Sequence, residues 1–181
     1  MQRGRHLNLV LLLAVLGCAQ GKNVVDITDY FQDCENGKPL PAIDVSELES
    51  LEDDNGNPTL NGKFKIEGDY NDPIKLKVYS KRLKQGTWTN GEISRDIPNL
   101  CLLLTSNWEP WYPMSSKMQR KKCPYNAGHV ETFDNILMGD MGMDIPDAFS
   151  GEWQMYIEAT TSRGGEKVTE CVRLAFTIKE I

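Results

Sequence analysis

The chain has 181 residues, with 20 basic and 26 acidic side chains and a formal net charge of −6 at pH 7. This acidic balance argues against a nucleic-acid-binding protein, because such proteins present clusters of Lys and Arg to the phosphate backbone. The length fits one domain with its own hydrophobic core.

The first 19 residues have the three-part layout of a secretory signal. Arg3 and Arg5 precede an apolar run over residues 7–16, and small residues follow it up to Ala19. The run is shorter than the about 20 residues that span a bilayer. We therefore expect cleavage after Ala19, which leaves residues 20–181 as one mature domain with 18 basic and 26 acidic side chains. No Asn-x-Ser/Thr acceptor for an N-glycan occurs, so we expect an extracellular protein rather than a lysosomal one.

Four cysteines remain once Cys18 has left with the signal. An even number in an oxidising compartment predicts two disulfides, for which three pairings are possible. A zinc site is the alternative, but no CxxC or CxH spacing supports it, and His129 is the only histidine of the mature chain. We therefore expect no metal and no other cofactor. The four cysteines are Cys34, Cys101, Cys123 and Cys171.

The N-terminal third contains an acidic stretch and then two alternating segments. Residues 24–54 hold ten acidic side chains, and we interpret them as an entry strand or loop. Apolar and polar side chains alternate over residues 63–70 and again over residues 74–81, with turn residues between the two segments. This period predicts two half-buried strands that pair as an antiparallel hairpin. Turn-forming residues then surround Trp88.

The middle of the chain, residues 97–124, lacks this alternation. A Leu-rich run is followed by four large side chains, with Pro110 and Pro113 between them. The prolines exclude a regular strand, so we expect a short helix or an irregular aromatic loop. A basic run follows the loop. It contains Lys117, Arg120, Lys121 and Lys122.

The C-terminal part predicts three more strands. One covers residues 130–138, and a connector rich in Gly, Asp and Met then leads to Pro146. Apolar residues share one face in residues 152–160 and in residues 167–179, on either side of a loop at residues 162–166, which is typical of a hairpin. At least six short strands with turn signals between them predict an all-β, single-domain sandwich or barrel.

Several motifs resemble the ganglioside-activator branch of secreted lipid-binding proteins, which is distantly similar to the MD-two-related lipid-recognition proteins. The Cys-Pro-x-x-x-Gly step that begins at Cys123 is one such motif. The segment from Asp144 to Trp153 and the closing hairpin, with its last cysteine at Cys171, are similar to the family, and so is the opening motif around Cys34. Insect chemosensory relatives with the same Cys-Pro-x-x-x-Gly step are a second group that the chain resembles.

The resemblance implies a β-cup with an apolar cavity that lifts a lipid out of a membrane and carries or presents it. It also implies that Cys34 bonds to Cys171 and that Cys101 bonds to Cys123. The lysosomal member of the family has four disulfides, whereas this chain has cysteines for two. Assistance to a glycosidase is therefore not carried over.

The inward faces of the predicted strands are the candidate lipid-binding residues. Alternation alone equally describes a filled core, because it reports burial and not empty space. The resemblance favours a cavity. The candidates are Phe64, Ile66, Leu76, Val78, Trp88, Trp153, Met155, Ile157, Leu174 and Phe176.

The aromatic loop is a candidate for the rim of the cup and for membrane contact. Amphipathic rings prefer the membrane interface, although the loop could instead fold back as a lid over the core. The basic run behind it suits lipid phosphates or sialic acid carboxylates, and the alternative is a solvated loop. The rim candidates are Trp108, Trp111, Tyr112 and Met114.

The leading hypothesis is a secreted, non-enzymatic protein that extracts or presents an amphipathic lipid. The alternative is an extracellular chemosensory or immune module that presents a ligand or a bare surface to a receptor. A hydrolase is disfavoured, because no nucleophile, base and oxyanion motif can be assembled from the sequence.

Overall fold

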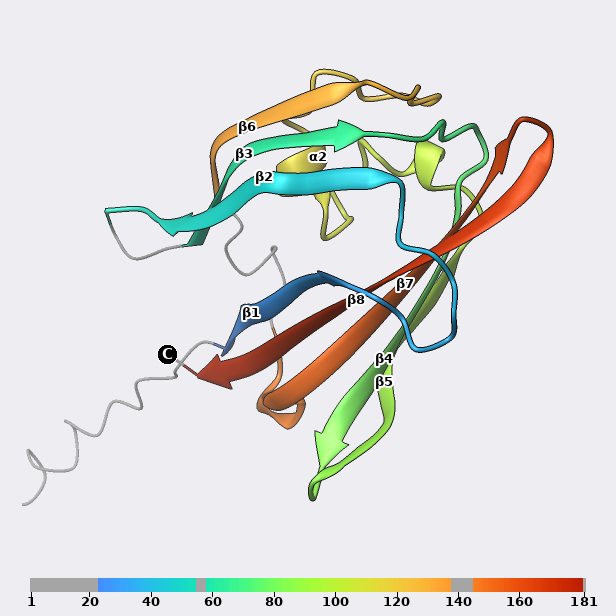
Figure 1. Cartoon of the computed structure of the whole chain (residues 1–181). Helices are drawn as coiled ribbons and strands as arrows, with labels where there is room; N and C mark the ends of the chain where they lie inside the picture. The colour runs from blue at the N-terminus through green and yellow to red at the C-terminus, as the bar shows by residue number, and fades with distance from the viewer. Residues whose placement is uncertain (1–22, 55–57, 138–144, 181) are drawn as a thin grey trace, which may run out of the picture.

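The computed structural model describes residues 23–54, 58–137 and 145–180, so the predicted signal at residues 1–19 lies outside the described residues. Two antiparallel sheets face each other (Figure 1). One has the strand order β1-β8-β7-β4-β5 and the other the order β2-β3-β6. The prediction of an all-β sandwich is confirmed. The strands are β1 (Asn23–Gln32), β2 (Ile43–Glu52), β3 (Pro58–Ile66), β4 (Lys75–Lys84), β5 (Thr87–Ile97), β6 (Val130–Leu137), β7 (Gly151–Arg163) and β8 (Glu166–Glu180).

Within the described ranges, three short helical turns interrupt the strands. In the predicted aromatic loop lie a 3-10 turn, η1 (Leu100–Leu102), and one turn of α-helix, α2 (Tyr112–Ser115). Pro113 occupies the first turn of α2, where its missing N–H costs nothing. A second 3-10 turn, η2 (Asp147–Phe149), directly precedes β7. The expectation of a short helix in residues 97–124 is therefore confirmed.

The predicted C-terminal hairpin is present. Strands β7 and β8 pair without a register shift from Gly151 opposite Ile178 to Arg163 opposite Glu166. The two-residue turn between them consists of Gly164 and Gly165, with φ angles of +62° and +86°. Two positive φ angles are what a tight hairpin turn needs, and glycine adopts them without steric cost.

The predicted hairpin between residues 63–70 and 74–81 is wrong. Strand β3 lies between β2 and β6 in the three-stranded sheet, whereas β4 lies between β5 and β7 in the five-stranded sheet. The chain crosses between the sheets after Tyr70, whose backbone N–H and C=O pair with those of Tyr125. Alternation indicates that a strand has one buried face, but it does not identify the neighbouring strand.

Three strands form where the sequence predicted less order. The acidic stretch, expected to be an entry strand or loop, forms both β1, which pairs with β8, and β2, which pairs with β3. The turn-rich region around Trp88 forms β5 at the edge of the five-stranded sheet. Asn90 and Gly91 lie next to a register shift in this strand and not in a loop.

The two sheets lie closest near the β7–β8 turn and diverge toward the C-terminal end of β8 (Figure 1). At the close end, the buried carboxylate of Glu170 in β8 accepts hydrogen bonds from Tyr70 Oη at 2.6 Å and from Arg163 Nη1 at 2.9 Å. Burial, and then the neighbouring carboxylate, raises the pKa of Tyr70. Because Tyr70 follows β3, this buried cluster links one sheet to the other.

The space between the sheets is filled at one end. A cluster of buried side chains there joins the three-stranded sheet to the segment that contains η1 and α2, and we call it the filled core. Its buried members are Ile66, Tyr70, Ile74, Leu104, Met118, Tyr125, Phe133 and Ile136.

Both disulfides implied by the family resemblance are present. Cys34 bonds to Cys171 across a separation of 137 residues, and Cys101 bonds to Cys123 across 22 residues. The first bond fastens the segment after β1 to the outer face of the five-stranded sheet, where both cysteines pack against Tyr156. The second bond joins η1 to the segment that leads into β6, beside the filled core.

Candidate ligand-binding pocket

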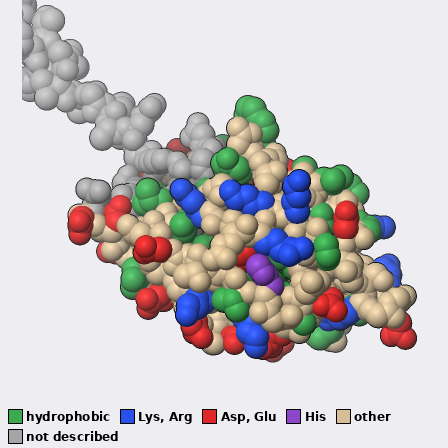
Figure 2. Space-filling model, turned by 90° about the horizontal axis from the view of Figure 1, so that it is seen from above, with side chains coloured by type: hydrophobic (Ala, Val, Ile, Leu, Met, Phe, Trp, Pro, Cys, Tyr) green, Lys and Arg blue, Asp and Glu red, His purple; other side chains and the backbone are tan. Residues whose placement is uncertain are grey.

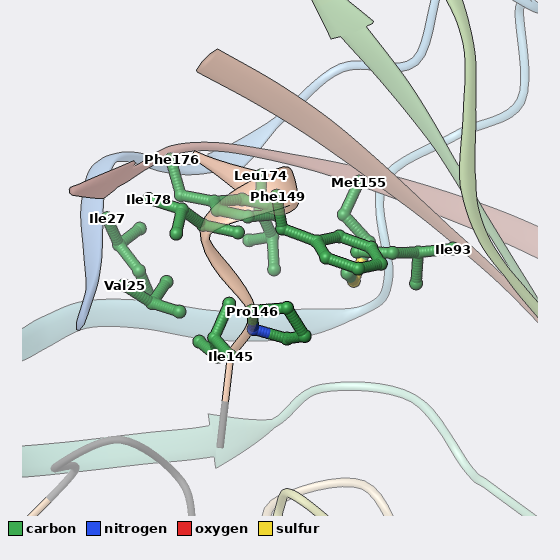
Figure 3. A pocket seen from close by; sticks show the side chains of 10 residues that line it. All are labelled: Val25, Ile27, Ile93, Ile145, Pro146, Phe149, Met155, Leu174, Phe176 and Ile178. Atoms are coloured by element: carbon green, nitrogen blue, oxygen red, sulfur yellow. The ribbon is translucent and has the colours of Figure 1, made fainter. Parts of the chain in front are cut away.

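A pocket of about 300 Å³ lies against the inner face of the five-stranded sheet, where the sheets diverge (Figure 3). The ten side chains of the described residues that line it are all apolar. Phe176 and Ile178 are buried, and the other eight remain partly or largely exposed, so the pocket is open to solvent. The lining residues are Val25, Ile27, Ile93, Ile145, Pro146, Phe149, Met155, Leu174, Phe176 and Ile178.

The register of the sheet brings these side chains together. Leu174 lies opposite Met155, and Ile27 lies opposite Phe176. Residues directly opposite each other in neighbouring strands point to the same face, so β1, β8 and β7 all contribute to one apolar surface. Val25 and Ile27 alternate with the exposed Asp26 and Thr28, which explains how an acid-rich segment supplies part of the lining.

Ser80 in β4 sets the position of Ile93 in the edge strand β5. The Ser80 hydroxyl donates a hydrogen bond to the carbonyl of Ile93 at 2.9 Å and accepts one from the Ile93 N–H at 3.2 Å. Ser80 is only 4% exposed, so its polar group is satisfied by backbone and not by solvent. Gly91 leaves room for this arrangement, because a Cβ there would collide with the Ser80 hydroxyl and with the Trp153 ring.

Residues 145–150 close one side of the pocket, and we call them the wall segment. Three strands hold the backbone of this segment. The Asn23 side chain in β1 donates to the carbonyl of Ile145 at 3.0 Å, and Trp153 Nε1 in β7 donates to the carbonyl of Phe149 at 2.7 Å. The Arg82 guanidinium in β4 donates to the carbonyl of Ser150 at 2.7 Å. The wall is therefore attached to the sheet that it faces.

Three aromatic rings form a stack beside the pocket. The Trp153 ring centroid lies 5.8 Å from that of Phe149 and 6.4 Å from that of Phe176, with interplanar angles of 19° and 6°. The Arg82 guanidinium, which donates to the wall segment, also lies 4.9 Å from the Trp153 ring. Trp153 is 1% exposed and is not a lining residue, so it supports the pocket through its contacts with Phe149 and Phe176.

The ten lipid-binding candidates from the sequence fall into separate places. Met155, Leu174 and Phe176 line the pocket. Phe64, Ile66 and Leu76 belong to or pack against the filled core instead.

Val78 and Ile157 face each other one row beyond the pocket. Trp88 lies opposite Leu83 near the β4–β5 turn and is 39% exposed, away from the lining. The lining residues of β1, β5 and the wall segment are not among the candidates predicted from the sequence.

The rim candidates also separate. Trp108 is 90% exposed, and Leu102 in the neighbouring η1 is 75% exposed. Trp111, Tyr112 and Met114 are partly buried, and Met114 packs against the filled core. The loop is thus neither a complete lid nor a complete rim, because part of it anchors the structure and part of it projects.

An ion pair holds this loop to the edge of the five-stranded sheet. The Arg95 guanidinium in β5 donates two hydrogen bonds to the Glu109 carboxylate, at 2.6 and 2.8 Å. The Glu109 side chain is 6% exposed and the Arg95 side chain 49% exposed. The hydrogen bond to Glu109 raises the pKa of Arg95. A bidentate pair of this kind fixes orientation as well as distance.

The basic run is anchored by a buried acid. Glu131 in β6 has no exposed surface, and its carboxylate accepts hydrogen bonds from the backbone N–H groups of Gln119 at 2.6 Å and Arg120 at 2.9 Å. His129 Nε2 lies 2.7 Å from the same carboxylate. The side chains of Lys117, Arg120, Lys121 and Lys122 remain exposed. Lys and Arg side chains gather on the face drawn in Figure 2.

Among the residues that the structure describes, no group of His, Cys, Asp or Glu is arranged to hold a metal ion. Over the same residues, no helix has the length and apolar character needed to cross a membrane.

The fold and the pocket together define a two-sheet β-sandwich, crosslinked by two disulfides, with an apolar recess between its sheets. No family model matches the chain, and no curated protein shows significant similarity to it.

Proposed function

We propose that this protein is a secreted, non-enzymatic lipid-binding protein that extracts or presents an amphipathic lipid. One observation supports the proposal above the others. The recess of about 300 Å³ has ten apolar lining side chains and is open to solvent. Pockets for small ligands usually have volumes of about 300–1,000 Å³, so this one is of sufficient size.

The energetics agree with a reversible carrier. Each CH₂ group that moves from water into an apolar site contributes about 0.8 kcal/mol, so a chain of about ten carbons gains roughly 8 kcal/mol before ordering costs. Association and loss of chain freedom offset several kcal/mol of this gain. The remainder suits a ligand that is bound and released, with no bond made or broken.

The exposed tip of the aromatic loop supports a transient membrane contact. Trp108 and Leu102 project into solvent, and the exposed cations Lys121 and Lys122 lie further along the same segment. Indole rings favour the membrane interface, and each Lys near an anionic surface contributes about 1 kcal/mol. We propose that this tip brings the protein to the lipid surface.

Two further features support membership in the ganglioside-activator-like family and an extracellular location. Both disulfides implied by the resemblance are present, and disulfides persist in oxidising compartments. The two-sheet fold with its recess agrees with the cup that the resemblance implies.

The direct test is to purify the protein from the medium of secreting cells and to analyse an organic extract of it by mass spectrometry. We expect an aliphatic lipid in near-stoichiometric amount, or uptake of one when the delipidated protein meets vesicles. A protein that contains no lipid and takes none from vesicles would refute the proposal.

A further inference from the structure

The capacity of the pocket limits the kind of lipid that it can hold. An apolar cavity of about 150 Å³ accommodates one benzene molecule, so a pocket of twice that volume holds roughly a dozen carbon atoms. The volume here is about 300 Å³. The two long chains of a membrane phospholipid or glycolipid need several times this space. One chain of moderate length is what fits.

Among the described residues, the lining offers no polar side chain to a head group. The nearest candidate in the sheet is the Ser80 hydroxyl, which lies opposite Met155, but it already donates to and accepts from the backbone of Ile93. A buried head group without a hydrogen-bond partner would bind unfavourably, so any polar end of the ligand stays at the solvent side.

A row of four residues marks the inner limit of the pocket. Along β8, β7 and β5, the lining includes Leu174, Met155 and Ile93, but not the next residue that faces inward on each strand. Those next residues lie directly opposite one another across the sheet. We call them the boundary row, and they are Val172, Ile157, Val78 and Arg95.

The boundary row is fixed at its β5 end. Arg95 forms its bidentate pair with Glu109 of the aromatic loop, and its guanidinium lies 6.0 Å from the Trp111 ring. Beyond the row, Leu76 of β4 packs against the filled core. A chain that enters from the wide end therefore meets the side chains of this row before it reaches the filled core, which gives the pocket a defined length.

From these observations, and resting on the proposed lipid-binding function, we infer that the ligand is a lipid with a single aliphatic chain. About a dozen of its carbons occupy the pocket, and its polar end, where it has one, remains in solvent. The volume does not hold both chains of a two-chain membrane lipid.

The test is a chain-length series of straight-chain alcohols, from about six to about sixteen carbons, with binding measured by displacement of a fluorescent fatty-acid probe from the mature protein. The dissociation constant should fall by up to about fourfold per added CH₂ as long as each new carbon is buried. We expect the fall to stop near twelve carbons. A two-chain phosphatidylcholine should bind more weakly than the best alcohol.

Two variants locate the limit. Ile157→Ala should move the chain-length limit to longer alcohols, because it shortens one side chain of the boundary row. The milder Ile157→Val should move the limit in the same direction, and it replaces the first variant if that one folds poorly. Met155→Phe, within the lining, should move the limit to shorter alcohols. Ile66→Ala is the matched control, because the same substitution in the filled core should leave the limit unchanged.

The outcomes separate this inference from the function on which it rests. Affinity that keeps rising through the longest alcohol, or phosphatidylcholine that binds as tightly as the best alcohol, would overturn the single-chain inference and leave lipid binding intact. Absence of binding by every alcohol and by phosphatidylcholine would overturn both.

Discussion

Trp108 and Trp111 are three residues apart in the same loop but have opposite environments. Trp108 is 90% exposed, whereas Trp111 is partly buried and donates its indole N–H to the carbonyl of Leu103 at 3.3 Å. The guanidinium of Arg95 faces the Trp111 ring at 6.0 Å. The first ring is available to a membrane, and the second maintains the loop.

This difference predicts different effects of two alanine substitutions. Trp108→Ala should change the free energy of unfolding by less than about 0.5 kcal/mol, as surface substitutions usually do, and should weaken pelleting with anionic vesicles. Trp111→Ala should destabilise the protein by about 1–3 kcal/mol, since it removes a packed ring and a hydrogen bond. Vesicle pelleting and urea unfolding measure the two effects. A Trp108→Ala protein that pellets like the wild type would show that the loop tip does not contact the membrane.

The disulfides should differ in their contribution to stability. In the chain-entropy model, closing a loop of 137 residues stabilises by about 5 kcal/mol and closing one of 22 residues by about 3 kcal/mol. Replacing Cys34 and Cys171 together by Ala should therefore lower the free energy of unfolding more than replacing Cys101 and Cys123 together. Urea denaturation of both double variants under non-reducing conditions tests this order. The reverse order would show that local packing around Cys101 outweighs the loop-length effect.

Gly91 is predicted to be intolerant of any side chain. A Cβ at this position would meet the Ser80 hydroxyl and the Trp153 ring. Gly91→Ala should therefore displace Ser80, disturb the hydrogen bonds that fix Ile93, and cost about 1–3 kcal/mol of stability, in the range of overpacked cores. Gly86 in the β4–β5 turn is an unsuitable control because its φ is +76°, so Thr87→Ala in the same hairpin serves instead. Gly91→Ala with unchanged stability and unchanged affinity for an aliphatic probe would argue against the role of Gly91.

The sequence predicted correctly those strands in which one face is buried and the other is polar. Alternation identified β7, β8 and the inward side of Met155, Leu174 and Phe176, because inward residues repeat every second position. It could not say which strands pair, so β3 and β4 were wrongly placed in one hairpin. Pairing depends on how the chain crosses between sheets after Tyr70, and that crossing has no local pattern.

The candidate site was predictable only in part, for a related reason. Alternation is identical over the filled core and over the pocket, so Phe64 and Met155 were indistinguishable in the sequence. Whether space remains between the sheets depends on the η1 and α2 segment, which fills one end. The wall residues Ile145 and Phe149 lie in a segment without periodicity, and only tertiary hydrogen bonds such as that from Trp153 bring them to the pocket.

Tyr125 should give the protein a distinct alkaline transition. Burial, and then the charge of Glu131, raises the pKa of Tyr125 to about 12. The unfolded chain loses the same proton near pH 10. Stability linked to this group is therefore fully present below about pH 10 and is lost as the pH rises toward 12. Tyrosinate absorbance followed against pH should show this late step. Tyr125→Phe should reduce its amplitude, while Tyr70, whose pKa burial also raises, still titrates late. An unchanged amplitude in that variant would assign the step to another tyrosine.

Blocking the recess between the sheets is the sharpest test of whether it is the binding site. Affinity for a fluorescent single-chain fatty acid should be measured for the wild type, for Leu174→Trp in the lining, and for Leu102→Trp on the exposed loop. We predict that Leu174→Trp binds at least about tenfold more weakly, a difference of about 1.4 kcal/mol, while Leu102→Trp binds like the wild type. Equal affinity of Leu174→Trp and the wild type, with both proteins folded, would show that the recess is not the binding site.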